Sequence, residues 1–472
     1  MPLPRPTPLF AALLALGVAA PAMATDQVTL EQLSQRLQAL EQRLGTTPAV
    51  ADGELDAASL DQRLRVIERK LELQAEESAN KAKSTPVVSL TPSKGLAVKS
   101  PDGDSEIRFR GLVQGDGRFF LDGDGPSDTF LLRRVEPTIE GNWGIFGFRI
   151  TGQFAGDTAT LQDAYADLKF DPRATVRVGK TKTPFGLERL QSSASTEQVE
   201  LGLPSELAPG RDIGVQLQGE LAQSTVTYAL GVYNGTVDGR DAVTSNPDDD
   251  FEIAARLFFE PWKNAGNGLS GLGFGIAGTH GDTHGAGSNY LPRYRTPGQV
   301  QFFGYRDDVL ADGERLRWSP QAYFYRGPLG LLGEYIVSRQ RLLSTTSGID
   351  ASIDNRAWQL SAGWVLSGED NSYKGVVKPN HPFAIGESGW GAFELVGRYG
   401  QLDIDDAAFP LFADPESAAR SASSWGLGLN WYLTANLKLM TNYTHTVFDG
   451  GDADGGDRPD ETTLFTRAQL SF

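Results

Sequence analysis

The chain has 472 residues, of which 22% are charged and 40% are hydrophobic, and its formal net charge is −17. This acidic balance argues against a nucleic-acid partner, because the phosphates of DNA or RNA would repel the protein. The chain contains no cysteine, so it cannot rely on disulfide bonds for rigidity. It also has no run of 18 or more apolar residues, which excludes an ordinary transmembrane helix.

Residues 1–24 have the pattern of a secretory signal peptide. Arg5 supplies the positive charge of a short n-region, residues 9–20 form the apolar h-region, and Ala22-Met23-Ala24 is a small-residue cleavage motif. A membrane anchor is the alternative, but the apolar stretch is short and no stop-transfer flank follows it. We therefore predict an exported protein whose mature chain begins near Thr25.

Residues 25–80 contain the apolar seam of a coiled coil. Leucines recur at alternating spacings of three and four residues, while glutamine, glutamate and arginine occupy the other positions. Neither of the two runs is long enough to be a stable helix alone, so we expect helices to associate between chains. A helical hairpin that folds on itself is the alternative. The seam residues are Leu30, Leu33, Leu37, Leu40 and Leu44, then Leu60, Leu64, Ile67 and Leu71.

Residues 81–104 predict a linker, because they mix lysine, serine, threonine, proline and glycine with little periodicity. From residue 105 to residue 472, apolar and polar residues alternate with a period of two, which indicates β-strands. A soluble sandwich would alternate as well, but many runs reach about ten residues, the length of a tilted strand that crosses a bilayer. Some connections are short, such as 171–173, whereas 235–250 and 449–460 are long and acidic. Short turns on one side of the sheet and long loops on the other are the pattern of a barrel. We predict an all-β fold, a transmembrane antiparallel β-barrel of about 16 strands around an aqueous channel.

The stretch from Arg177 to Leu190 begins as a strand that cannot continue. Pro184 removes a backbone donor and Gly186 frees the backbone, so the strand should break there. The residues that follow, as far as Gly210, show no sustained alternation, and an ordered loop of this length usually has a function. We predict that residues 184–210 fold inward and constrict the pore, with Pro184 and Gly186 as the hinge.

The chain contains six specific segments, at residues 163–170, 179–190, 209–216, 228–235, 319–323 and 327–335. Together these segments resemble the phosphate-selective porins O and P. The run 464–472, which ends on Phe472, also resembles the assembly signal of Gram-negative outer-membrane barrels. The resemblance implies a homotrimeric 16-stranded channel in the outer membrane, in contact with lipid and lipopolysaccharide, with its N-terminal segment in the periplasm. It also implies that the loop after the fifth strand enters the lumen and that basic residues guide phosphate or polyphosphate.

An anion pore needs fixed positive charge on its wall, and arginine suits phosphate because its planar guanidinium binds oxygens in pairs. Strand alternation places several arginines in the lumen, and further basic residues flank the predicted constriction. Each arginine could instead pair with an inward carboxylate, as in general porins. The predicted anion-contacting residues are Arg110, Arg118, Arg134, Arg149, Arg177, Arg256 and Arg317 on the wall, and Lys180, Lys182, Arg189 and Arg211 near the loop.

Arg133 is also a predicted anion-contacting residue, because Arg133-Arg134 resembles a paired-arginine position of the family, although strand alternation alone gives Arg133 the wrong parity for the lumen. Residues 191–210 depart from the family, since they contain no lysine or arginine but do contain Glu197, Glu200 and Glu206. The sequence therefore leaves open a general or other-anion diffusion porin. A structural outer-membrane anchor, tethered to the cell wall by its coiled coil, is a further alternative. We predict no enzyme activity, no cofactor and no metal site, because the four histidines fall in no nucleophile or metal motif.

Overall fold

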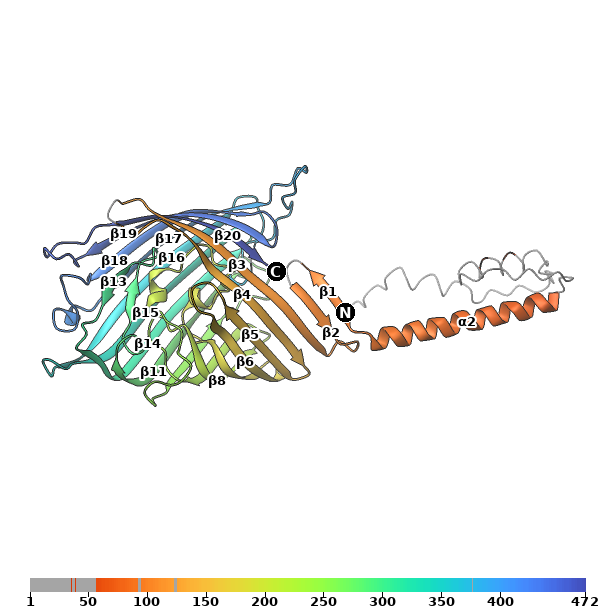
Figure 1. The fold of residues 1–472 in the computed structure, drawn as a ribbon, viewed down its shortest axis with the longest axis horizontal. Helices are drawn as coiled ribbons and strands as arrows, with labels where there is room; N and C mark the ends of the chain where they lie inside the picture. Colours follow the sequence, from red (N-terminus) through yellow and green to blue (C-terminus); the bar gives the residue numbers. More distant parts are fainter. Residues whose placement is uncertain (1–34, 36–38, 40–56, 92–94, 123–124, 376) are drawn as a thin grey trace. The chain divides into compact units, whose positions relative to one another are not determined.

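The computed structural model describes residues 35, 39, 57–91, 95–122, 125–375 and 377–472. The chain divides into two units, one that ends at Thr85 and one that runs from Pro86 to Phe472. The described part of the first unit is helical, and the second unit is a β-barrel (Figure 1).

Helix α2 of the first unit runs from Ala57 to Ser84. It contains Leu64, Ile67 and Leu71 of the predicted seam, in a sequence rich in alanine, glutamate, lysine and arginine, which are good helix formers. The first seam, residues 30–44, lies outside the described residues except for residues 35 and 39, so the coiled-coil association stays a prediction. Among the described residues, no helix is long and apolar enough to cross a membrane.

The second unit is a closed antiparallel barrel. Its described strands are β3 Ser105–Phe120, β4 Thr129–Trp143, β5 Phe146–Gln153, β6 Thr160–Asp171, β7 Ala174–Lys182, β8 Arg211–Leu221, β9 Val226–Tyr233, β10 Glu252–Phe259, β11 Leu272–Ala286, β14 Val309–Arg326, β15 Leu329–Ser344, β16 Asp350–Val365, β17 Ala392–Asp403, β18 Ser421–Tyr432, β19 Leu437–Asp449 and β20 Glu461–Ser471. These sixteen strands close where β20 pairs with β3, from Thr463 opposite Phe120 to Ser471 opposite Leu112. The prediction of a barrel of about 16 strands is confirmed.

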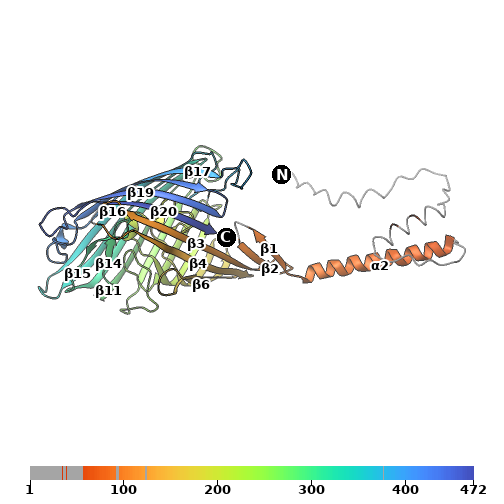
Figure 2. The ribbon, with the colours of Figure 1, turned by 45° about the horizontal axis from the view of Figure 1, so that its top comes forward.

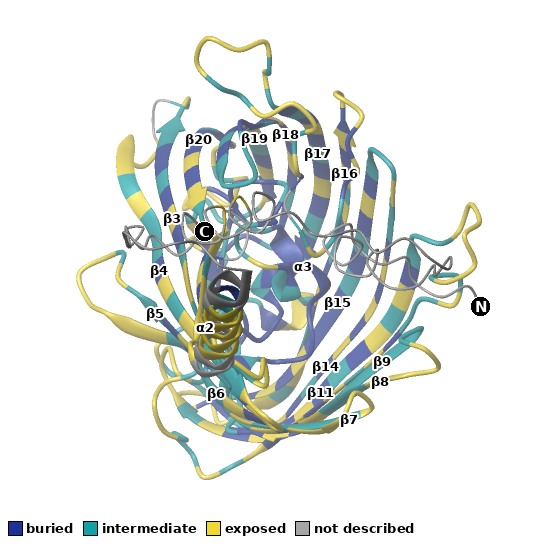
Figure 3. Ribbon diagram, turned by 90° about the vertical axis from the view of Figure 1, so that its right-hand side faces the viewer, coloured by how far each residue is buried: buried dark blue, intermediate teal, exposed yellow. Residues whose placement is uncertain are grey.

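The strands sort their side chains in the opposite way from a water-soluble sheet. In β18, Trp425, Leu427 and Leu429 point outward and are exposed, whereas Ser424 and Asn430 point inward and are buried. The same alternation of exposed and buried residues bands the strands in Figure 3. An apolar outer face around a polar lumen suits a barrel surrounded by lipid, because closure pairs the backbone groups within the sheet.

The connections differ between the two ends of the barrel. One end, here named the short-turn end, carries the turns 144–145, 172–173, 222–225, 327–328 and 433–436. The other, the long-loop end, carries residues 183–210, 234–251, 287–308 (with the small strands β12 Arg293–Arg295 and β13 Gln301–Gly304) and 404–420 (with η2 Asp406–Ala408). Two connections depart from this division, because residues 260–271 between β10 and β11 and residues 366–391 between β16 and β17 form long loops at the short-turn end.

The segment 81–104, predicted as a linker, contains regular structure. Strands β1 (Val87–Thr91) and β2 (Gly95–Lys99) form an antiparallel hairpin. Strand β2 also pairs with β3, from Leu96 opposite Phe109 to Lys99 opposite Glu106. The strands have apolar compositions, VVSLT and GLAVK, but each is only five residues long, which is too short for alternation to distinguish a strand from a linker.

Gly179 in β7 marks a position where the barrel wall accepts no side chain. Its φ is +123°, and a Cβ there would lie 2.2 Å from the carbonyl oxygen of Ala164 on β6. Gly179→Ala is therefore expected to lower the free energy of unfolding by about 2 kcal/mol, because a backbone atom cannot rotate away. The midpoint of urea unfolding, followed by the heat-modifiable electrophoretic mobility of the barrel, measures the change. Gly278→Ala is the control, since its nearest atom lies 3.4 Å away; equal shifts would contradict the expectation.

Candidate functional site

The chain leaves the barrel wall between β7 and β8 and folds into the lumen. β7 ends at Lys182 and β8 begins at Arg211, so residues 183–210 form this constriction loop. A hydrogen bond of 3.0 Å from the N–H of Thr183 to the carbonyl of Gly210 joins its two ends. The loop contains the short helices α3 (Leu187–Leu190) and η1 (Leu203–Glu206), and Figure 3 shows α3 inside the barrel. The strand thus ends two residues before Pro184, next to the predicted hinge.

Glu188 attaches the constriction loop to the wall and to itself. Its buried carboxylate accepts hydrogen bonds from Arg398 on β17 and from Gln359 on β16, each 2.9 Å long. It also accepts a bond of 2.8 Å from the N–H of Gly202, on the far side of the loop. A buried carboxylate with this many donors is a strong constraint, because losing it would leave several buried polar groups unpaired.

Wall side chains hold the rest of the loop through its backbone. The donors come from β18, β19, β20 and β3, which are neighbouring strands, so the loop follows the wall around the lumen. They are Asn430 to the carbonyl of Glu197 (2.8 Å), Lys438 to Thr196 (2.9 Å), Gln469 to Ala194 (2.9 Å) and Gln114 to Ser193 (3.0 Å). The loop is therefore a fixed part of the barrel interior.

Apolar side chains of the loop fill one side of the lumen. Phe185 and Leu207 are fully buried in a cluster with Phe302 and Phe303 of connection 287–308 and Phe412 of connection 404–420. The cluster also includes residues of β14 to β18. Because this side is filled, the open space of the lumen lies on the opposite side, next to the first strands of the barrel.

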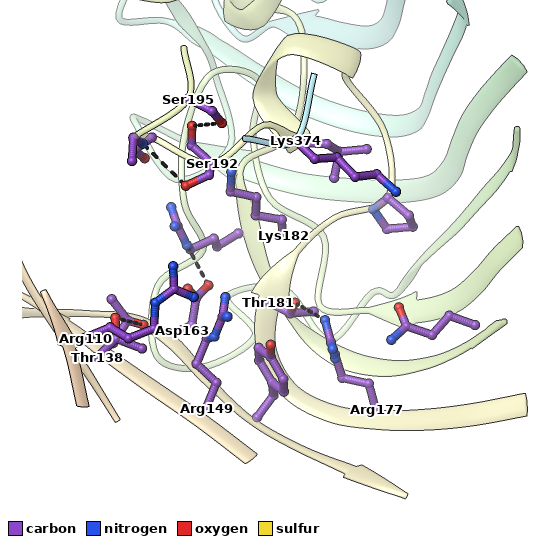
Figure 4. A pocket seen from close by; sticks show the side chains of 18 of the residues that line it. Arg110, Thr138, Arg149, Asp163, Arg177, Thr181, Lys182, Ser192, Ser195 and Lys374 are labelled. Atoms are coloured by element: carbon purple, nitrogen blue, oxygen red, sulfur yellow. Dashed lines mark hydrogen bonds and ion pairs between the residues drawn. The ribbon is translucent and has the colours of Figure 1, made fainter. Parts of the chain in front are cut away.

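A cavity of about 940 Å³ lies on that opposite side, between the constriction loop and strands β3 to β10 (Figure 4). Ser192, Ser193 and Ser195 of the loop line it, and Pro172 and Ala435 line it at the short-turn end. Among the described residues, its lining has eight basic and three acidic members: Arg110, Arg149, Arg177, Lys182, Arg211, Arg256, Lys374 and Lys378 against Glu136, Asp163 and Glu220. The lining is therefore mostly basic although the whole chain is acidic.

Four of the lining arginines are ion-paired with carboxylates of β4 or β6. The pairs are Arg211 with Asp163 (2.9 Å), Arg177 with Asp167 (2.8 and 3.0 Å) and Arg149 with Glu140 (3.0 Å). Arg110 lies 3.4 Å from the same Glu140. Such pairs leave the donors in place but reduce the net positive charge. The alternative of paired arginines, which strand alternation allowed, thus describes part of the wall.

Lys182 and Arg189 stabilise the constriction loop. Lys182 donates to the carbonyl of Arg189, at 2.7 Å, and to that of Gln191, so its ammonium caps the C-terminal end of α3. Arg189 donates to the carbonyl of Ser205 within the loop. Arg256, which lines the cavity, donates to Gln321 at 2.9 Å. These residues were predicted as anion contacts, and two of them have structural bonds to loop carbonyls.

Lys180 and Arg317 do not line the cavity. Lys180 shares the outward face of β7 with Val178 and donates to the carbonyl of Ala242 at 2.9 Å. Arg317 points inward, as strand alternation predicted, but it is fully buried and bonded to Glu252 (2.8 Å) and to Asp238. Asp238 belongs to connection 234–251, which folds over this arginine. The alternation of residues along a strand cannot predict that a distant connection covers one of them.

Arg133 reaches the lumen because β4 has a bulge. Gln114 on β3 pairs with Arg134, but the next residue, Gly115, pairs with Leu132, so Arg133 is an extra residue on β4. The parity argument against Arg133 therefore fails at this position. Arg134 donates to Gln114 at 2.8 Å, and Arg133 donates to Glu200.

Glu200 of the constriction loop occupies the space between wall arginines. Arg133 binds its carboxylate with two bonds of 2.6 and 3.0 Å, and Arg118 approaches to 3.3 Å. Burial opposes ionisation, but Arg133, Arg467 and Arg134 outweigh it and lower the pKa of Glu200 to about 2. Among the described residues, Nε of Arg118 and Nη1 of Arg467 are buried without a hydrogen-bond partner. The constriction loop thus places the carboxylate of Glu200 among the arginines of the barrel wall.

The loop of residues 366–391 is a part of the site that sequence reasoning missed. Tyr373 donates a hydrogen bond of 2.7 Å to the carbonyl of Leu187 in α3, and Lys374 and Lys378 line the cavity. The sequence does contain a feature that indicates a functional loop here, because this stretch interrupts the alternation between two long strands and contains two lysines. It was overlooked because long functional loops were expected at one end only.

The acidic side chains of the site do not form a metal centre. In the part of the chain that the structure describes, no group of three or more His, Asp or Glu side chains is placed to hold a metal ion. Glu188 and Glu200 instead accept bonds from arginine, glutamine or backbone donors. These two carboxylates therefore act as acceptors for ion pairs and hydrogen bonds.

Comparison with a solved structure supports this architecture. The outer membrane channel DcaP of Acinetobacter baumannii superposes with a TM-score of 0.52 at 12% identity, over 79% of this chain and 99% of that protein. The anion-selective porin from Comamonas acidovorans superposes with a TM-score of 0.47 at 13% identity, over 78% of this chain and all of that protein (100%).

The sequence comparison is more specific. Porin O of Pseudomonas aeruginosa is 24% identical over 419 residues, which cover 80% of this chain and 91% of that protein. Residues 113–472, from the middle of β3 to Phe472, match the family described as phosphate-selective porin O and P. The protein is therefore an outer-membrane porin that belongs to the phosphate-selective porin O and P family.

Proposed function

We propose that this porin is a passive aqueous channel for small anions, with phosphate or polyphosphate as the permeant. The observation that carries the proposal is the cavity beside the constriction loop, with eight basic and three acidic lining residues. Guanidinium groups bind oxyanions through paired hydrogen bonds, and several spaced charges let an anion move on. Family membership supports the same permeant.

A general or other-anion porin is the second candidate. It is favoured by the ion-paired arginines and by the absence of lysine and arginine from residues 191–210. Single-channel recording in planar bilayers separates the candidates. For the first, the reversal potential in a KCl gradient shows anion preference and added phosphate blocks the chloride current. Anion preference without phosphate block favours the second candidate, cation preference overturns both, and no conductance favours the structural anchor.

The double change Lys374→Gln and Lys378→Gln is expected to reduce the anion-to-cation permeability ratio about threefold. Both lysines line the cavity, and removing two positive charges from a water-filled vestibule weakens its attraction for anions by less than about 1 kcal/mol. Reversal potentials in a salt gradient measure the ratio. Lys263→Gln removes one charge at a residue that pairs with Glu260 in the connection 260–271, so its ratio should stay at the wild-type value. A double variant that matches the wild type would contradict a role for these lysines.

We further propose that the porin is a homotrimer in contact with lipid and lipopolysaccharide, with residues 25–80 in the periplasm. The apolar seam in that segment supports association between chains. Mass measurement of the detergent-solubilised protein by light scattering tests the oligomer. A monomer would overturn this assignment without affecting the channel proposal.

A further inference from the structure

The β1–β2 hairpin exposes its apolar face. Leu90 is 75% exposed and Val88 is 66% exposed, whereas Ala97 on the opposite face is 5% exposed. A hairpin in water would cover its apolar face against the protein, and this one does the reverse. The apolar face holds Val88, Leu90, Leu96 and Val98. The opposite face holds Ser89, Gly95 and Ala97 together with Val87, Thr91 and Lys99, and the last three are also exposed.

This apolar face continues the outer surface of the barrel. Leu90 pairs with Leu96, Leu96 with Phe109, Phe109 with Ile139, and Ile139 with Ile150. One row of apolar side chains therefore crosses β1, β2, β3, β4 and β5, and all five are exposed. The part of the row on β3, β4 and β5 belongs to the face that a membrane barrel turns to lipid.

The hairpin lies where the barrel wall has a step. β20 ends opposite Leu112, and Phe472 exchanges backbone hydrogen bonds of 2.9 and 3.0 Å with Gly111. β3 begins earlier, at Ser105, so its first residues extend past β20. Strand β2 supplies their pairing partners, and the hairpin lies beside β3 in both views (Figures 1 and 2). Unpaired backbone groups are costly next to lipid, and this pairing removes them from β3.

We propose that the β1–β2 hairpin is an extension of the barrel wall that binds lipid, with its apolar face on acyl chains at the short-turn end. Lipid is the occupant because the row from Ile150 to Leu90 is continuous with the membrane-facing wall. The outer edge of β1 then lies at the interface, where water and headgroups reach its backbone groups. This proposal does not depend on which ion the channel conducts.

Single cysteines test the proposal without background, because the chain has none. Spin labels are attached to Leu90→Cys, Ser89→Cys, Ile139→Cys and Ala453→Cys in the full chain, reconstituted in phosphatidylcholine–phosphatidylglycerol vesicles. Collision rates with oxygen, which dissolves in lipid, and with a water-soluble nickel complex are compared. Ile139 is the lipid reference on the wall, and Ala453 is the water reference in an exposed loop.

The label at position 90 is expected to show an oxygen-to-nickel ratio close to that at position 139 and several-fold above those at positions 89 and 453. A ratio at position 90 equal to that at position 453 would mean that the face is in water and would overturn the proposal. Protection from both reagents would also overturn it, because a second protein chain would then cover the face. The heat-modifiable mobility of each variant establishes that the barrel is folded.

Discussion

Glu200→Gln is expected to raise the anion-to-cation permeability ratio of the channel about fivefold. The substitution removes the negative charge that Arg133 and Arg118 bind, and the uncompensated guanidinium groups then attract anions with about 1 kcal/mol more free energy. Glutamine keeps the size of the side chain, and the carbonyl of Glu200 still accepts its bond of 3.0 Å from Arg398. Reversal potentials in asymmetric KCl measure the ratio.

The effect of Glu200→Gln is expected to be the same at about pH 5 and about pH 8. A pKa of about 2 means that the carboxylate is ionised throughout this range. Its contribution to stability is complete above the ordinary pKa of glutamate and is lost only as the pH falls toward 2. Glu197→Gln is a control of the same size that removes little charge at about pH 5, because burial and the neighbouring Glu394 raise the pKa of Glu197 to about 8. This loop carboxyl accepts a bond of 3.1 Å from Tyr325 rather than from an arginine. Equal ratios in the two variants would show that Glu200 has no special effect on selectivity.

Glu188→Ala is expected to raise the single-channel conductance at least about twofold and to increase current noise. The substitution removes the acceptor shared by Arg398, Gln359 and Gly202 and leaves buried donors without it, at a cost of about 3–5 kcal/mol to the docking of the loop. A loop that is no longer held against β16 and β17 narrows the lumen less. Conductance histograms in symmetric KCl at about 1 M measure the change. Salt at this concentration screens the surface charges of the protein.

Two variants separate release of the loop from loss of charge. Glu188→Gln keeps a carbonyl oxygen for one donor, so its conductance should lie between those of the wild type and Glu188→Ala. Glu220→Ala removes the same charge from a cavity-lining residue of β8 that is exposed and lies outside the loop, so its conductance should stay near the wild-type value. A wild-type conductance in Glu188→Ala would contradict the anchoring role.

The barrel could be predicted from the sequence because its signals are local. A strand that faces lipid on one side and a polar lumen on the other must alternate apolar and polar residues. Trp425, Leu427 and Leu429 of β18 show this alternation. The break at Pro184 and Gly186 is also local, since a missing donor and a freed backbone act within a few residues. These features predicted the closed sheet and the start of the constriction loop.

The site itself depends on contacts between distant residues, which no local pattern records. Arg133 enters the lumen only because a bulge shifts β4 by one residue against β3, and Arg317 is covered by a connection that follows β9. The β1–β2 hairpin is defined by pairing with β3, and Lys374 reaches the cavity from the end where short turns were expected. Glu188 and Arg398 lie 210 positions apart in the chain. Strand alternation therefore predicts the wall, whereas three-dimensional packing determines which charges are compensated and which of them face the permeating ion.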